Sequence, residues 1–239
     1  MRALPEFGTA CLAPAIAAND IMIANAVPAK AEMHVLNVDG AQLLGHQHLE
    51  PLALGIDLLS LSGHKLYGPK GIGALVVAPA VELKPQLHGG AQEGGLRSGS
   101  IPLPLVVGLA EALERSLADA PQRAQRLAVL RDRLWQGLES LGGVLINGCL
   151  DQRLAHNLNV TVEGVDGARL HSALRRRLAL SGGSACSSLS GEPSHVLLAL
   201  GRSRQQAAAS LRFGLGRSTT ATEIDQALDW LTEQVHALR

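Results

Sequence analysis

Short apolar runs alternate with polar or amphipathic segments along this chain, and their spacing predicts an α/β protein. Four runs in the first half are rich in Val, Ile and Leu and have the length of buried strands. Loops or short helical segments separate them, a pattern typical of a parallel or mixed sheet. In such sheets ligands bind beyond the carboxyl ends of the strands, so functional residues are expected there. The predicted strands are residues 20–27, 34–39, 56–63 and 72–78.

The second half of the chain predicts an α+β arrangement that follows two long helices at residues 103–117 and 121–141. The last predicted helix has a capping box formed by Thr220 and Glu223, and apolar residues recur every three or four positions from Ile224 onward. We expect a domain boundary near residues 119–121, which gives domains of residues 1–118 and 119–239. The remaining expected elements are strands at 144–147, 157–162 and 211–216 and helices at 167–177, 193–200 and 222–238.

Composition narrows the classes of function. The chain has 239 residues, and 21 Lys and Arg are balanced by 21 Asp and Glu, a neutral balance unsuited to binding a nucleic-acid backbone. Hydrophobic residues make up 46% and charged residues 18% of the chain, which argues against intrinsic disorder. No apolar run approaches the roughly 18 residues of a membrane span. Three cysteines give no disulfide framework, so we expect a cytoplasmic protein with no membrane or nucleic-acid partner.

Lysine is scarce, with four lysines among the 21 basic residues, yet Lys65 and Lys70 share one glycine-rich stretch, SLSGHKLYGPKGIGALVV (60–77). Glycines let such a loop turn tightly and approach a ligand. A lysine that loses its water at the mouth of a sheet presents a neutral amine, the nucleophile that a Schiff base with an aldehyde requires. The alternative is a structural Gly-Pro loop with two solvated lysines. Asp39 ends a predicted strand, and we expect it either to face the same site as Lys65 or to cap a helix.

Five sequence blocks resemble those of a known family. SGHKLYGPKGIGAL (62–75) is similar to the cofactor-lysine segment of cysteine desulfurases, NifS-like members of the class V aminotransferase superfamily, which use pyridoxal 5′-phosphate (PLP). The resemblance implies a fold-type I PLP-dependent transferase: part of a large PLP-binding domain with a mixed sheet in residues 1–118, and a complete α+β small domain with the cysteine loop in residues 119–239. The other similar blocks, in the family's order, are HVLNVDGAQ (34–42), HGGAQEGGLRSGS (88–100), SGGSACSSLSGEPSHVLLALG (181–201) and ASLRFGLGR (209–217).

The resemblance implies a set of cofactor contacts. Lys65 would bind PLP covalently and then move the α-proton of the substrate. Asp39 would bond the protonated pyridine nitrogen, and Gln42 would touch the ring hydroxyl oxygen. Ser62 and His64 flank the lysine and would bind the phosphate group.

The resemblance also implies a reaction and its partners. Cys186 would be the nucleophile that takes sulfur from L-cysteine as a persulfide while alanine leaves; the alternative is a small buried core residue. Arg212 would clamp the substrate carboxylate, because an arginine in an apolar strand must find a partner, and Asn25 would contact substrate. Ser100 would reach the phosphate of a neighbouring subunit, which implies a homodimer. The sulfur would pass to an acceptor or iron–sulfur scaffold protein. No metal ligand is assigned, and transient binding of an iron–sulfur cluster by Cys186 stays open.

The sequence departs from the family at its beginning. The family's upstream region, which grips the phosphate and stacks a histidine on the PLP ring, has no counterpart, so we expect an N-terminally truncated chain. Residues 26–33 are too few for a parallel crossover, so the strand at 20–27 must pair differently or lie outside the sheet. A non-catalytic remnant with impaired PLP binding and a selenocysteine lyase therefore stand as alternatives.

Overall fold

The computed structural model describes residues 35–47, 49–182 and 193–239. These residues form two compact units, one ending at residue 122 and the other beginning at residue 123. The division lies a few residues beyond the predicted boundary at 119–121, inside the second long helix. The predicted strand at 20–27 and the candidate residues Asn25 and Cys186 lie outside the described residues.

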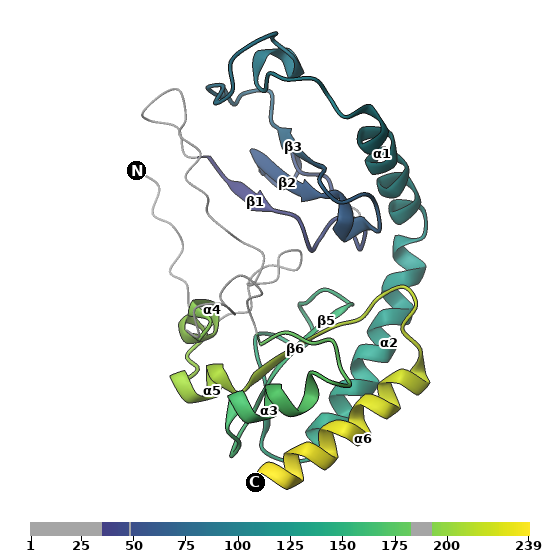
Figure 1. The fold of residues 1–239 in the computed structure, drawn as a ribbon, viewed down its shortest axis with the longest axis vertical. Coiled ribbons are helices and arrows are strands. Elements are labelled where there is room, and N and C mark those ends of the chain that lie inside the picture. The colour runs from purple at the N-terminus through teal and green to yellow at the C-terminus, as the bar shows by residue number, and fades with distance from the viewer. Residues whose placement is uncertain (1–34, 48, 183–192) are drawn as a thin grey trace. The chain divides into compact units, whose positions relative to one another are not determined.

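The first unit is built on a three-stranded mixed sheet in the order β1-β2-β3 (Figure 1). β1 (Asn37–Asp39) pairs parallel with β2 (Leu58–Ser62), and β2 pairs antiparallel with β3 (Gly73–Val77). The predicted mixed sheet is confirmed, although β1 occupies only the second half of its expected range. A short 3-10 helix, η1 (Gly63–Leu66), follows β2 directly and carries Lys65.

The long helix α1 (Leu103–Ala118) packs against this sheet and against η1. Leu109 of α1 shares a core cluster with Val38 of β1, Leu59 of β2 and Leu66 of η1. Ser116 of α1 also donates a hydrogen bond from Oγ to the carbonyl of Leu66 at 3.2 Å. A further 3-10 helix, η2 (Glu93–Gly95), lies in the glycine-rich segment before α1. The helix that carries Lys65 is therefore held by core packing and a buried hydrogen bond.

The second unit combines an antiparallel sheet in the order β4-β5-β6 with helices. Its strands are β4 (Val144–Ile146), β5 (Asn157–Val162) and β6 (Ser210–Gly214). Its helices are α2 (Ala120–Glu139, most of which belongs to this unit), α3 (Gly167–Leu174), α4 (His195–Ala199), α5 (Arg204–Ala208) and α6 (Ala221–Leu238). The sequence analysis predicted all of these except α5.

Side chains alternate across the second sheet, and one face forms the larger core. Leu158 and Val160 of β5 pack with Leu134 of α2 and with Leu231 and Val235 of α6. These residues are almost fully buried, so helices α2 and α6 cover the same face of the sheet.

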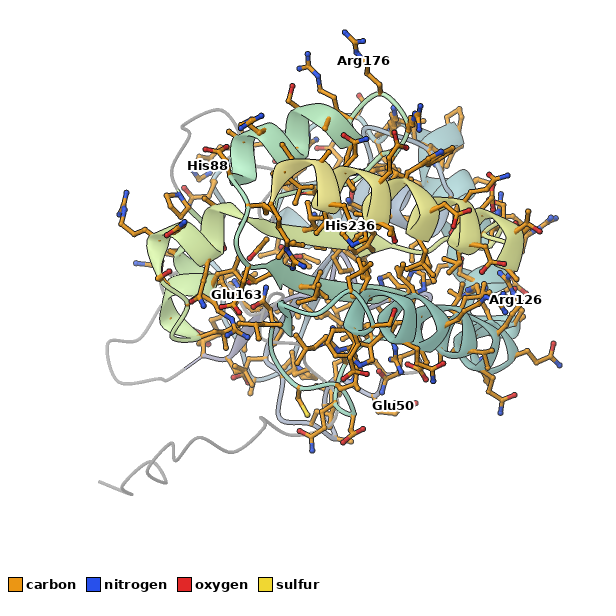
Figure 2. All side chains as sticks on the ribbon, turned by 90° about the horizontal axis from the view of Figure 1, so that it is seen from below. Glu50, His88, Arg126, Glu163, Arg176 and His236 are labelled. Carbon is orange, nitrogen blue, oxygen red and sulfur yellow. The ribbon has the colours of Figure 1, made fainter. Side chains whose placement is uncertain are left out.

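The start of α6 is fixed by two sets of contacts. The predicted capping box is confirmed, because Thr220 Oγ1 accepts the N–H of Glu223 at 3.3 Å and the Glu223 carboxylate accepts the N–H of Thr220 at 2.8 Å. Arg126 of α2, labelled in Figure 2, donates to the carbonyls of Arg217 and Thr219, each at 2.7 Å, in the loop before α6. None of the described helices is long and apolar enough to cross a membrane.

Candidate functional site

The carboxyl ends of β1 and β2 carry predicted cofactor residues. Asp39 is the last residue of β1 and pairs in register with Ser60 of β2. β2 ends two residues later at Ser62, and η1 then places Lys65 three residues further along. Because the two strands are parallel, their carboxyl ends lie at the same edge of the sheet. The structure therefore puts Asp39 and the helix with Lys65 at one edge.

The backbone after β1 fixes the Asp39 carboxylate in a turn. Oδ1 of Asp39 accepts the N–H of Ala41 at 2.9 Å, and the N–H of Gly40 donates to the carbonyl of Ser60 at 2.8 Å. A Cβ at Gly40 would lie 2.7 Å from Leu59 Cδ1, so glycine permits this close approach to β2. The residues that follow form turns and not a helix, so the helix-cap alternative for Asp39 is wrong.

Around Lys65, buried residues hold the helix and polar residues are exposed. Leu66 is buried and anchors η1, while His64 and Lys65 are exposed. Ser62 Oγ and His64 Nδ1 are joined by a hydrogen bond of 2.9 Å. The Lys65 side chain makes no hydrogen bond or ion pair with a described residue. Lys65 therefore keeps its water among the described residues, as the alternative of a loop with solvated lysines predicts, and the expected desolvation of its amine is wrong.

The remaining predicted residues are spread over the chain. Gln42 is half-buried in the turn directly after β1, at the same edge of the sheet as Asp39. Ser100 is exposed in the loop before α1, and no hydrogen bond between described residues links it to the Lys65 region. Arg212 lies in the second unit, on β6.

The edge formed by β1 and β2 fits a PLP group by its donor chemistry. The second carboxylate oxygen of Asp39 has no partner among the described residues and suits a pyridine N–H donor. The exposed amine of Lys65 is accessible to an aldehyde, and the hydroxyl of Ser62 with the imidazole of His64 suits a phosphate. Gly63, at the base of η1, lacks a Cβ that would lie 2.9 Å from Ile72 Cγ2, so the loop folds closely over the strand end.

In the second unit, β6 places Arg212 on the polar face of the sheet. Its neighbours Leu211 and Phe213 belong to the core, so Arg212 points to the opposite face, where it pairs with Asn159 of β5. The side chain is half-buried and has no hydrogen-bond partner among the described residues. Its backbone exchanges two hydrogen bonds with Ser181, of 2.7 and 3.3 Å. Ser181, the first residue of the block 181–201 that contains Cys186, is therefore hydrogen-bonded to the backbone of Arg212.

The sequence analysis did not identify the buried polar network on the same face of this sheet. Asn147 donates from Nδ2 to Asn159 Oδ1 at 2.8 Å, and Thr161 and Ser210 share a hydrogen bond of 2.8 Å. Arg202 donates from Nε to Asn147 Oδ1 at 2.6 Å. The alternation in NLNVTV (157–162), with Asn, Asn and Thr at every second position, was the available signal. This network stabilises the pairing of β5 with β6, the strand that carries Arg212.

Arg153 supports the network from its edge. Its guanidinium donates to the carbonyls of Asn147 at 2.8 Å and Cys149 at 2.7 Å. Burial lowers the pKa of Arg153 to about 10, because the charged form loses its water. It stays charged at neutral pH, so its part in the fold is to satisfy buried carbonyls.

A family model and two curated relatives match most of this chain. The aminotransferase class-V family model matches residues 22–227. The cysteine desulfurase IscS of Tolumonas auensis is 46% identical over 212 residues, which is 88% of this chain and 52% of that protein. IscS of Aeromonas hydrophila is also 46% identical, over 86% of this chain and 51% of that protein. The chain therefore spans about half the length of the curated relatives it matches.

Solved structures give the same result for the fold. A NifS-like protein superposes with a TM-score of 0.76 at 31% identity, covering 87% of this chain and 54% of that chain. DndA from Streptomyces lividans superposes with a TM-score of 0.58 at 36% identity, covering 75% of this chain and 52% of that chain. The predicted fold-type I transferase fold is thereby confirmed. With most of its length matched by the family model, this chain belongs to the aminotransferase class-V family, whose members depend on PLP.

Proposed function

We propose that this chain is a PLP-dependent cysteine desulfurase, which removes sulfur from L-cysteine and releases alanine. The observation that carries the proposal is the parallel pairing of β1 with β2, because it brings Asp39 and the helix with Lys65 to one edge. The similar proteins named cysteine desulfurase support the same reaction. Since this chain spans about half of their length, turnover has to be measured on the chain itself.

At the sheet edge, each residue has a distinct task toward the cofactor. PLP, when bound, supplies an electron sink for bond breaking at the amino acid substrate. Asp39 would accept a hydrogen bond from the protonated ring nitrogen, and Gln42 would contact the ring hydroxyl oxygen. Ser62 and His64 would bind the phosphate. Lys65 would hold the cofactor through its amine and would also move the proton of Cα of L-cysteine.

Arg212 and Cys186 act on the substrate. Arg212 binds the substrate carboxylate with two parallel N–H donors. Asn25, which is not among the described residues, is also assigned to the substrate. The Cys186 thiolate attacks the substrate sulfur, so an S–S bond forms and the Cβ–S bond breaks. The electron pair of the broken bond stays with the substrate carbon, which takes up a proton and leaves as alanine. Cys186 keeps the transferred sulfur as a persulfide.

The persulfide and the loop before α1 suggest the partners. A thiolate of an acceptor or iron–sulfur scaffold protein takes the outer sulfur from Cys186 by thiol exchange. Ser100 is exposed in its loop, and its hydroxyl reaches the phosphate of a second subunit in a homodimer. We expect the protein to work in the cytoplasm.

The reaction is tested by incubating the purified chain with PLP and L-cysteine and measuring alanine together with the mass of the peptide that contains Cys186. We expect alanine to form and the peptide to gain one sulfur atom. Cys186→Ser should abolish both results, whereas the matched variant Cys149→Ser should retain them. Alanine formation by Cys186→Ser at the wild-type rate would refute the assigned nucleophile.

The two alternatives predict different results in the same assay. A non-catalytic remnant would bind PLP weakly and form no alanine. A selenocysteine lyase would release alanine from L-selenocysteine and not from L-cysteine. The similar proteins of Tolumonas auensis, Aeromonas hydrophila and a Shewanella species are each named cysteine desulfurase IscS, which favours the desulfurase.

A further inference from the structure

His171 of α3 is a half-buried histidine held between its own helix and a strand. Leu170 and Leu174 of the same helix belong to the core, so α3 presents the imidazole from a fixed position. The ring donates from Nε2 to the carbonyl of Ser210, the fully buried first residue of β6, at 3.1 Å. The imidazole is therefore fastened at the start of the strand that carries Arg212.

The same ring lies against the backbone of Gly182. A Cβ on Gly182 would lie 2.9 Å from both Cε1 and Nε2 of His171, closer than a side-chain carbon approaches a neighbouring atom. Gly182 does not have the left-handed φ that by itself favours glycine. The space beside the imidazole, and not the backbone conformation, is therefore what requires glycine at this position.

Ser181, the residue before Gly182, is bound to β6 as well. Its carbonyl accepts the N–H of Arg212 at 2.7 Å, and its N–H donates to the carbonyl of Arg212 at 3.3 Å. Two consecutive residues are thus held, one by His171 and one by Arg212. Both contacts lead to β6, so this strand supports the Arg212 guanidinium and also fixes residues 181–182.

Cys186 follows Gly182 by four positions in the sequence. Four residues of fully extended chain span at most about 14 Å, so Gly182 is the start of a short tether to the thiol. In the proposed reaction, this thiol meets the sulfur of an L-cysteine whose carboxylate is bound by Arg212. A shift of Gly182 relative to β6 therefore changes the separation of the two sulfur atoms.

We infer that His171 is a positioning residue for sulfur transfer: through its contact with Gly182, it fixes where the tether to Cys186 begins relative to Arg212. This role rests on the proposed function and adds a residue to it. Loss of the imidazole slows the attack of the Cys186 thiolate on the substrate sulfur. Binding of PLP and of the substrate carboxylate is left unchanged, because His171 acts through Gly182.

Steady-state kinetics of alanine formation, expressed per bound PLP, test this role. His171→Ala should lower kcat about tenfold to a hundredfold, because a small misplacement of a reacting group can cost that much in rate. KM for L-cysteine should change little, since Arg212 is untouched. His171→Gln places an amide nitrogen as many bonds from Cβ as Nε2 is, so it should recover much of the rate.

His236→Ala is the matched control, because His236 is an exposed histidine in the last turn of α6 (Figure 2). This variant should have the kcat and KM of the wild type. A histidine with only a structural role would behave differently from the inferred one. His171→Ala would then lower the free energy of unfolding in urea but leave kcat per bound PLP unchanged.

A double-mutant cycle tests the contact between the two residues. Gly182→Ala should lower kcat, because the added Cβ pushes the start of the tether away from the ring. In the His171→Ala background the same methyl group has room, so Gly182→Ala should cost little more. The two effects on kcat should therefore be far from additive, as expected for residues in contact.

Three results would overturn the inference and leave the desulfurase proposal intact. They are wild-type kcat in His171→Ala, a rise in KM at unchanged kcat, and additive effects of His171→Ala and Gly182→Ala. If the wild type itself forms no alanine, the proposed function is refuted and the role of His171 with it. If His171→Ala does not fold, Gly182→Ala decides, because wild-type kcat in that variant would also overturn the inference.

Discussion

Asp39 lies beside Ser60 in the parallel register of β1 and β2, and the next residue, Gly40, donates its N–H to the Ser60 carbonyl at 2.8 Å. This hydrogen bond crosses from the end of one strand to the other and holds the turn in which the Asp39 carboxylate is fixed. The strand that contains Ser60 continues into η1 and Lys65. One strand pair thus positions the proposed ring-nitrogen partner and the proposed cofactor lysine.

The negative charge of Asp39 should contribute more to PLP affinity than its ability to accept a hydrogen bond. Asp39→Asn keeps an oxygen for the Ala41 N–H but removes the negative charge that a protonated ring nitrogen requires. A lost charged hydrogen bond costs about 1.5–3 kcal/mol, so PLP should bind roughly tenfold to a hundredfold more weakly. A PLP titration followed by absorbance measures this change.

Asp57→Asn is the matched control for that titration. The Asp57 carboxylate also accepts one backbone N–H, that of Leu36 at 2.9 Å, but it lies just before β2, at the opposite end of the strand. It should bind PLP as the wild type does. Equal PLP affinity for the wild type and Asp39→Asn would remove Asp39 from the cofactor site.

The Arg212 guanidinium should act through its forked geometry. Arg212→Lys keeps the charge and loses the two parallel donors. We expect KM for L-cysteine to rise about tenfold or more while kcat changes little, because a ground-state contact to the carboxylate is lost. The free energy of unfolding should stay near the wild-type value, since the side chain has no partner among the described residues.

Arg176→Lys serves as the control for Arg212, because Arg176 is exposed at the periphery of the ribbon (Figure 2). This variant should leave KM unchanged. A structural role for Arg212 would instead give lower stability with an unchanged KM, and that outcome would contradict the substrate assignment.

Replacement of Gly167, the first residue of α3, by alanine should destabilise the protein. A Cβ there would collide with the backbone carbonyl of Ala208 at the end of α5, which cannot move as a flexible side chain can. Gly167→Ala should lower the free energy of unfolding by about 1–3 kcal/mol, measured by urea denaturation. Gly214→Ala, where an added Cβ meets no atom within 4 Å, should be neutral or stabilise the protein by up to about 1 kcal/mol. Equal stability of the two variants would contradict this packing.

Local signals were sufficient to predict most elements of this fold. The apolar spacing from Ile224 onward and the Thr220–Glu223 capping box are contained within α6, so its bounds follow from its own sequence. The helix α5 was missed although Ser203 and Gln206 form a capping box at its start. Its sequence, RQQAA, lacks the large apolar residues that mark α4, HVLLA, which has the same length.

The surroundings of the site residues depended on contacts between distant parts of the chain. The turn that holds Asp39 depends on a hydrogen bond from the N–H of Gly40 to the carbonyl of Ser60, which is 20 residues later. Arg212 faces Asn159 because β5 and β6 pair across the segment that contains α3, α4 and α5. The exposure of Lys65 likewise depends on which residues pack over η1. Sequence pattern indicates where a strand ends, but the neighbouring strand determines what its last side chain meets.

The most direct measurement of the central claim is covalent trapping of PLP on Lys65. The chain is incubated with PLP, reduced with borohydride and digested, and the lysine peptides are weighed by mass spectrometry. We expect the pyridoxyl phosphate mass on Lys65 in the wild type and in Lys70→Ala, which changes the second lysine of the same loop, and no label in Lys65→Ala. Label on Lys70 in place of Lys65, or equal labelling of all lysines, would contradict the account.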